Sequence, residues 1–126
     1  MNLYLKLGVL FATIALVFYS IFAARMRKKA DASRADCVLQ TTGLDFDIAG
    51  TVLMIIGSER IPLTVHGVIG YSALAAMLVK TALVWAHALK GVPQPARARL
   101  FGNLAYAWWI VAFVAGGIIA MAGVGR

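Results

Sequence analysis

The chain has 126 residues, of which 62% are hydrophobic and only 13% are charged, and its mean hydropathy is +0.85. This composition is too apolar for a soluble domain of that length, and it predicts a protein that crosses a membrane several times. The net charge of +7 does not indicate nucleic-acid binding, because most basic residues lie in two short loops between apolar segments. We therefore expect a lipid bilayer, and no nucleic acid, as the partner.

Four apolar segments predict four membrane-spanning helices, at residues 3–24, 37–57, 61–89 and 100–123. They leave no room for a separate soluble domain, so we expect one all-α transmembrane domain over residues 1–126, folded as an integral membrane four-helix bundle. Lys and Arg concentrate in the loops 25–36 and 90–99. The positive-inside rule places these loops in the cytoplasm and both termini on the other side.

The first segment is expected to remain in the protein as a span. Its apolar run is too long for the core of a cleaved signal peptide, and it ends in ARMRKK where a signal peptide has a small-residue cleavage site. Cys37 is the one cysteine, so an internal disulfide is excluded.

The second segment carries two acids, Asp45 and Asp47, inside the membrane. An Asp at the middle of a membrane helix costs roughly 2.5 to 3.5 kcal/mol, so each needs a partner or water. Asp47 shares a helix face with Gly50 and Thr51, a small and polar stripe that predicts an inward orientation. Asp45 points elsewhere and lies closer to the cytoplasm, where it can reach the headgroups.

The third segment places His66, Lys80 and His87 on one stripe, because their spacings are multiples of seven. The two histidines are roughly 30 Å apart along the axis, so each belongs near a different membrane surface. Pairing segments two and three as an antiparallel hairpin brings Asp47 and Lys80 to within ~10 Å in depth, with side chains that lean toward each other. This predicts a direct or water-bridged ion pair, with snorkelling of Lys80 to the headgroups as the alternative.

The fourth segment has a ridge of small residues for close packing within the bundle or between protomers, formed by Ala112, Gly116 and Ala120. Gly50, Gly67 and Gly70 are the other residues expected at helix contacts.

Three stretches, ALVFYSIFAARMRKK, GLDFDIAGTVLM and VHGVIGYSAL, resemble in order the HsmA-like family of small bacterial four-helix membrane proteins. Asp47, Gly50 and Thr51 match a D-x-x-G-T element, and the sequence from His66 to Gly70 matches an H-G-x-x-G element, which includes Gly67. The resemblance implies a multi-pass protein of the bacterial inner membrane, and it supplies no secure activity.

The resemblance also concerns further histidines, which many relatives carry in the third and fourth helices. The corresponding places in this chain hold Lys80 and Gly102. This departure weakens the transfer of a multi-histidine haem or metal site.

The preferred function is that of a non-enzymatic subunit that forms oligomers or belongs to a larger membrane assembly. No G-x-S-x-G, H-E-x-x-H or phosphate-loop motif supports soluble-type catalysis. One alternative is a haem b electron carrier, a dimer in which His66 faces His66 of the second copy near the outer membrane surface and His87 faces its counterpart near the cytoplasmic surface. A second alternative is a small proton-coupled transporter that uses Asp47.

Overall fold

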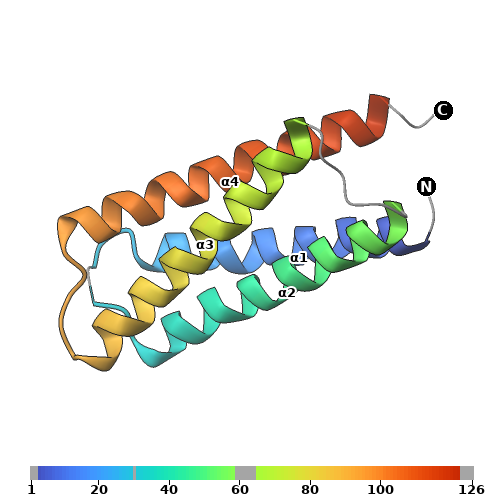
Figure 1. Cartoon of the computed structure of the whole chain (residues 1–126). Helices are drawn as coiled ribbons and strands as arrows, with labels where there is room; N and C mark the ends of the chain where they lie inside the picture. Colours follow the sequence, from blue (N-terminus) through green and yellow to red (C-terminus); the bar gives the residue numbers. More distant parts are fainter. Residues whose placement is uncertain (1–2, 30, 59–64, 123–126) are drawn as a thin grey trace.

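The computed structural model describes residues 3–29, 31–58 and 65–122, with side chains described for residues 3–29, 31–57 and 67–118. Those ranges contain four helices and no strand: α1 (Leu3–Arg25), α2 (Arg34–Ser58), α3 (Val65–Leu89) and α4 (Ala96–Ala122) (Figure 1). The prediction of an all-α four-helix bundle is confirmed. Each helix is long and apolar enough to cross a membrane, as a multi-pass membrane protein requires.

Two helices begin earlier than the apolar pattern predicted. Helix α2 begins at Arg34 because Ser33 caps it: the Ser33 hydroxyl accepts the backbone N–H of Asp36 at 3.2 Å, and the Asp36 carboxylate accepts the N–H of Ser33 at 2.9 Å. This reciprocal pair is a capping box. Helix α4 begins at Ala96, directly after Pro95, whose fixed φ suits a helix start. The predicted start of α3 at residue 61 lies outside the described residues.

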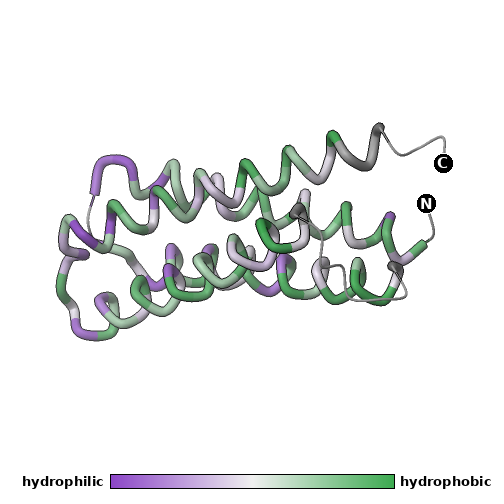
Figure 2. Tube along the Cα trace, turned by 45° about the horizontal axis from the view of Figure 1, so that its top comes forward, coloured by the Kyte–Doolittle hydropathy of each residue, from purple (hydrophilic) through white to green (hydrophobic). Residues whose placement is uncertain are grey.

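The basic loops lie together at one end of the bundle, which we call the basic end. There α1 ends, α2 begins, α3 ends and α4 begins, on the left of Figure 1. Figure 2 shows hydrophilic residues gathered at this end and mostly hydrophobic ones along the helices. The basic end holds Arg25, Arg27, Lys28, Lys29, Arg34, Lys90, Arg97 and Arg99. One charged end is what the alternation of apolar segments and basic loops predicts.

Helices α1 and α2 run antiparallel and side by side, while α3 crosses the bundle obliquely (Figure 1). Gly8 and Gly50 make the close approach of α1 and α2 possible, because a Cβ at either position would lie 3.0 Å from the backbone oxygen of the other. Gly50 is thus a packing residue. Gly70 makes no such close approach among the described residues, because a Cβ there would meet nothing within 4 Å. Its role in helix packing stays a prediction.

The remaining predicted packing residues differ in burial. Gly67 and Ala112 are buried, and Gly116 is half-buried. The side chain of Ala120 lies outside the described residues. Ala112 belongs to a core cluster that also contains Tyr19, Leu44, Met77 and Trp109, so all four helices contribute to it. Two members of this cluster, Tyr19 and Trp109, contact the buried Asp47.

Candidate functional site

Asp47 lies inside the bundle, as predicted, with 6% of its surface exposed. Its Oδ2 accepts two hydrogen bonds, from the Tyr19 hydroxyl at 2.8 Å and from the Trp109 indole N–H at 2.9 Å. The Tyr19 and Trp109 rings also meet edge to face, with their centroids 5.0 Å apart. Asp47 therefore joins α1, α2 and α4 at one point.

Thr51 is not part of this contact. Its hydroxyl donates to the backbone carbonyl of Asp47 at 2.9 Å, one helical turn earlier. The Thr51 hydroxyl is therefore bonded within its own helix and does not donate to the Asp47 carboxylate.

Lys80 is equally buried, with 6% of its surface exposed, but it lies at a different place. Its Nζ sits 5.0 Å from the centre of the Phe22 ring and 5.4 Å from that of Tyr106. Its stem packs against Gly102, where a Cβ would lie 3.3 Å from Lys80 Cε. Lys80 and Gly102 are therefore in contact with each other.

The expected ion pair between Asp47 and Lys80 does not form. Both ion pairs within the described part of the chain use Asp36. On α3, Thr81 and Trp85 contact α2: the Thr81 hydroxyl accepts a hydrogen bond from Gln40 at 3.1 Å, and the Trp85 indole donates to Thr41 at 2.6 Å. Successive helical residues differ by ~100° in direction, so the residue before Thr81 lies on a different side of α3 from the one that contacts α2. Lys80 consequently points toward α1 and α4.

Asp36 is a polar centre that the sequence-based interpretation missed. It is fully buried and forms ion pairs with Arg25 and Lys29, so it ties the end of α1 to the start of α2. It also accepts hydrogen bonds from the backbone and hydroxyl of Ser33. The S-x-x-D spacing of residues 33–36 is the signal that could have revealed it.

Asp45 faces outward on α2, in an exposed stripe with Val38 and Val52, seven residues away on either side. At ~1.5 Å per residue it lies about 17 Å from the start of α2 at Arg34 and about 20 Å from its end at Ser58. It is therefore near the middle of the helix, deeper than expected, because α2 starts earlier. Within the described ranges, no residue donates a hydrogen bond to its carboxylate.

The histidines are only partly described. His87 is half-buried, and its Nδ1 lies 2.8 Å from the backbone oxygen of Leu83 in the same helix. The side chain of His66 lies outside the described residues. Where side chains are described, no three or more His, Cys, Asp or Glu residues gather to hold a metal ion. The possible use of His66 and His87 as haem or metal ligands stays a prediction.

Comparisons with protein-family models, curated proteins and solved structures found no match to this chain. Its function is therefore inferred from the side chains and contacts described above.

Proposed function

We propose that this chain is a non-enzymatic membrane subunit that assembles with a second copy of itself through the outer face of α2. Asp45 carries the proposal: it is a carboxylic acid on the outside of the bundle, near the middle of a membrane-spanning helix. Exposure of an Asp to lipid at that depth costs roughly 2.5 to 3.5 kcal/mol. A partner helix offsets part of this cost by supplying a hydrogen bond.

A second copy supplies that hydrogen bond through symmetry. A twofold axis parallel to the membrane normal brings residues of equal depth together, so each Asp45 meets its counterpart. At such an axis the two Asp45 side chains can hydrogen-bond to each other, a contact that neither makes in a single copy. The stripe of Val38, Asp45 and Val52 keeps one face along a helix pair that crosses at about 20°. The exposed side chain of Ile56 extends the same apolar surface.

The interior of the bundle supports a structural rather than a catalytic role. The Oδ2 atom of Asp47 is already bonded to Tyr19 and Trp109 within a packed core. A carboxylate held in this way contributes to the docking of three helices. The second alternative, proton-coupled transport by Asp47, draws less support from this arrangement.

The proposal places the subunit in the bacterial inner membrane with its basic end toward the cytoplasm. Support comes from the excess of Lys and Arg at that end and from the resemblance to the HsmA-like family. A reporter enzyme that is active only in the cytoplasm, inserted in the loop of residues 26–33, tests the orientation, and we expect it to be active.

Energy transfer between labelled copies in liposomes tests the assembly. Wild-type protein and Asp45→Asn, which keeps hydrogen-bonding groups at this position, are expected to dimerise. Asp45→Leu is expected to weaken dimerisation about five- to thirtyfold, since hydrogen bonds between membrane helices contribute about 1 to 2 kcal/mol. Thr13→Leu is the matched control, because Thr13 is exposed on α1 and its hydroxyl bonds within that helix. A monomeric wild type, or equal affinities for Asp45→Leu and Thr13→Leu, contradicts the proposal.

A further inference from the structure

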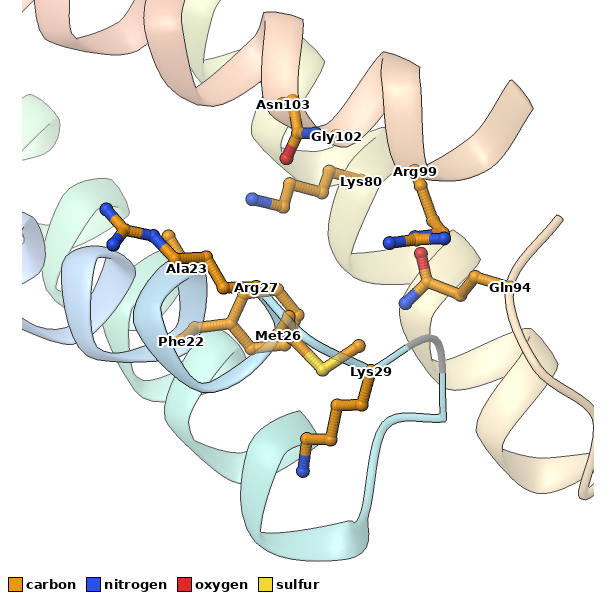
Figure 3. A pocket seen from close by; sticks show the side chains of 10 residues that line it. All are labelled: Phe22, Ala23, Met26, Arg27, Lys29, Lys80, Gln94, Arg99, Gly102 and Asn103. Atoms are coloured by element: carbon orange, nitrogen blue, oxygen red, sulfur yellow. The ribbon is translucent and has the colours of Figure 1, made fainter. Parts of the chain in front are cut away.

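A small cavity lies at the basic end, between the end of α1, the C-terminal half of α3 and the start of α4 (Figure 3). Its volume is about 150 Å³. Ten residues line it, of which four are cationic and none is acidic. The cations are Arg27, Lys29, Lys80 and Arg99. Such a concentration of one charge around a cavity attracts anions.

Lys80 is the buried member of this set. Figure 3 shows its amino group in the space between the Phe22 ring and Asn103. Lys80 has only 6% of its surface exposed, and a charged group inside a bundle is costly unless an anion or polar group compensates it. The rings of Phe22 and Tyr106 offer partial compensation. The rings carry no opposite charge, which an anion in the cavity would supply.

The charges around the cavity are not balanced from within the described part of the protein. Lys29 forms an ion pair with Asp36. No described ion pair joins an acid to Arg27, Lys80 or Arg99, because the other one links Arg25 to Asp36. The cavity therefore presents three cations that an external anion can neutralise.

The lining combines two chemistries that suit a phosphate attached to an apolar group. Arg99 offers the guanidinium fork that binds phosphate oxygens, and Lys80 offers a compact positive charge. The amides of Gln94 and Asn103 provide further donors. On the α1 side, Phe22 and Met26 form an apolar wall. At about 150 Å³ the cavity is smaller than the ~300 to 1,000 Å³ of most small-molecule pockets, so it suits a headgroup better than a large metabolite.

We propose that this cavity binds a phosphate-bearing anion, and that the position favours the headgroup of an anionic phospholipid. The cavity lies where the membrane-spanning helices meet the basic loops, the depth at which headgroups occur. Contact between α1 and α4 is sparse, so a lipid can approach from the bilayer between them. The second copy proposed above docks on α2, so this site does not depend on it.

Titration with phosphatidylglycerol, followed by native mass spectrometry of the purified protein, tests the site. Arg99→Gln is the decisive variant, since Arg99 is exposed and its loss leaves the core intact. Arg97→Gln is the matched control: it removes the same charge, also from an exposed position in the first turn of α4, but Arg97 does not line the cavity. Arg99→Gln and Lys80→Met are expected to weaken lipid binding about tenfold or more, as loss of a charged hydrogen bond does. General attraction to the basic end accounts for at most about a fivefold change in Arg97→Gln.

If Arg97→Gln and Arg99→Gln weaken the binding of phosphatidylglycerol equally, the proposal is overturned, because the attraction is then diffuse and involves no defined site. Absence of retained phosphatidylglycerol in the wild type overturns the lipid assignment, and if inorganic phosphate does not bind either, the phosphate site is overturned as well. A second titration, with inorganic phosphate alone, separates the two sources of the ligand. Binding of inorganic phosphate that is lost in Arg99→Gln, without retention of lipid, keeps the phosphate site and overturns the lipid assignment.

Discussion

Replacement of Tyr19 by Phe is the sharpest test of the contact at Asp47. The substitution removes one hydroxyl from a fully buried ring and changes nothing else in size. That hydroxyl donates to Asp47 at 2.8 Å, and its loss leaves the carboxylate with the Trp109 indole as its only described donor. Hydrogen bonds to charged groups contribute about 1.5 to 3 kcal/mol in proteins, whereas those between membrane helices average nearer ~0.6 kcal/mol. We expect the free energy of unfolding to fall by about 1 to 2 kcal/mol.

Two other tyrosines provide a matched series for this measurement. The Tyr106 hydroxyl lies 2.7 Å from that of Ser20, a bond between two neutral groups. The Tyr71 hydroxyl is buried and has no hydrogen-bond partner among the described residues. We measure the free energy of unfolding by sodium dodecyl sulfate in mixed micelles, followed by circular dichroism. The decrease in this free energy should be largest for Tyr19→Phe, smaller for Tyr106→Phe and smallest for Tyr71→Phe. If Tyr19→Phe destabilises no more than Tyr71→Phe, the contact at Asp47 does not hold the helices together.

Three further predictions concern other parts of the bundle. Asp36→Asn is expected to lower the free energy of unfolding by about 1 to 3 kcal/mol in the same assay, because the substitution removes two ion pairs of a buried carboxylate with partly exposed cations. An unchanged free energy would show that Asp36 does not hold the end of α1 to the start of α2. Gly50→Leu should cost ~1 to 3 kcal/mol, since its side chain meets the backbone of Gly8 at 3.0 Å, whereas Gly70→Ala has free space and should be neutral or stabilising; equal effects of the two would refute the close approach of α1 and α2. His87→Ala is expected to leave the absorption spectrum of protein from haem-replete cells unchanged, and a Soret band that this variant abolishes would instead establish the haem alternative.

The apolar pattern was sufficient to predict the four helices and the inward face of Asp47. Each span follows from the length of an apolar run, and the small residues on the Asp47 face identify the side that packs. The starts of α2 and α4 were missed because their first turns contain charged residues. A helix boundary taken from the end of an apolar run leaves such turns out. At α2, the capping box of Ser33 and Asp36 marks the true start.

The residues that contact the buried polar side chains could not be predicted from the sequence. Tyr19 and Trp109 are 28 and 62 residues from Asp47, and only the arrangement of α1 and α4 brings them to one oxygen. Lys80 was assigned to Asp47 because the depths of the two residues match in an antiparallel hairpin. Depth alone does not fix the rotation of α3, and the contact through Thr81 turns Lys80 toward a different pair of helices.

Disulfide cross-linking across the outer face of α2 tests the proposed assembly most directly. In a Cys37→Ser background, Val52→Cys places one thiol on the α2 stripe, and Val111→Cys places one at a similarly exposed position on α4. Mild oxidation in native membranes is expected to yield covalent dimers from Val52→Cys, to lose them when Asp45→Leu is added, and to yield none from Val111→Cys. Equal cross-linking at both positions, or cross-linking at Val52→Cys that persists with Asp45→Leu, would contradict assembly through Asp45.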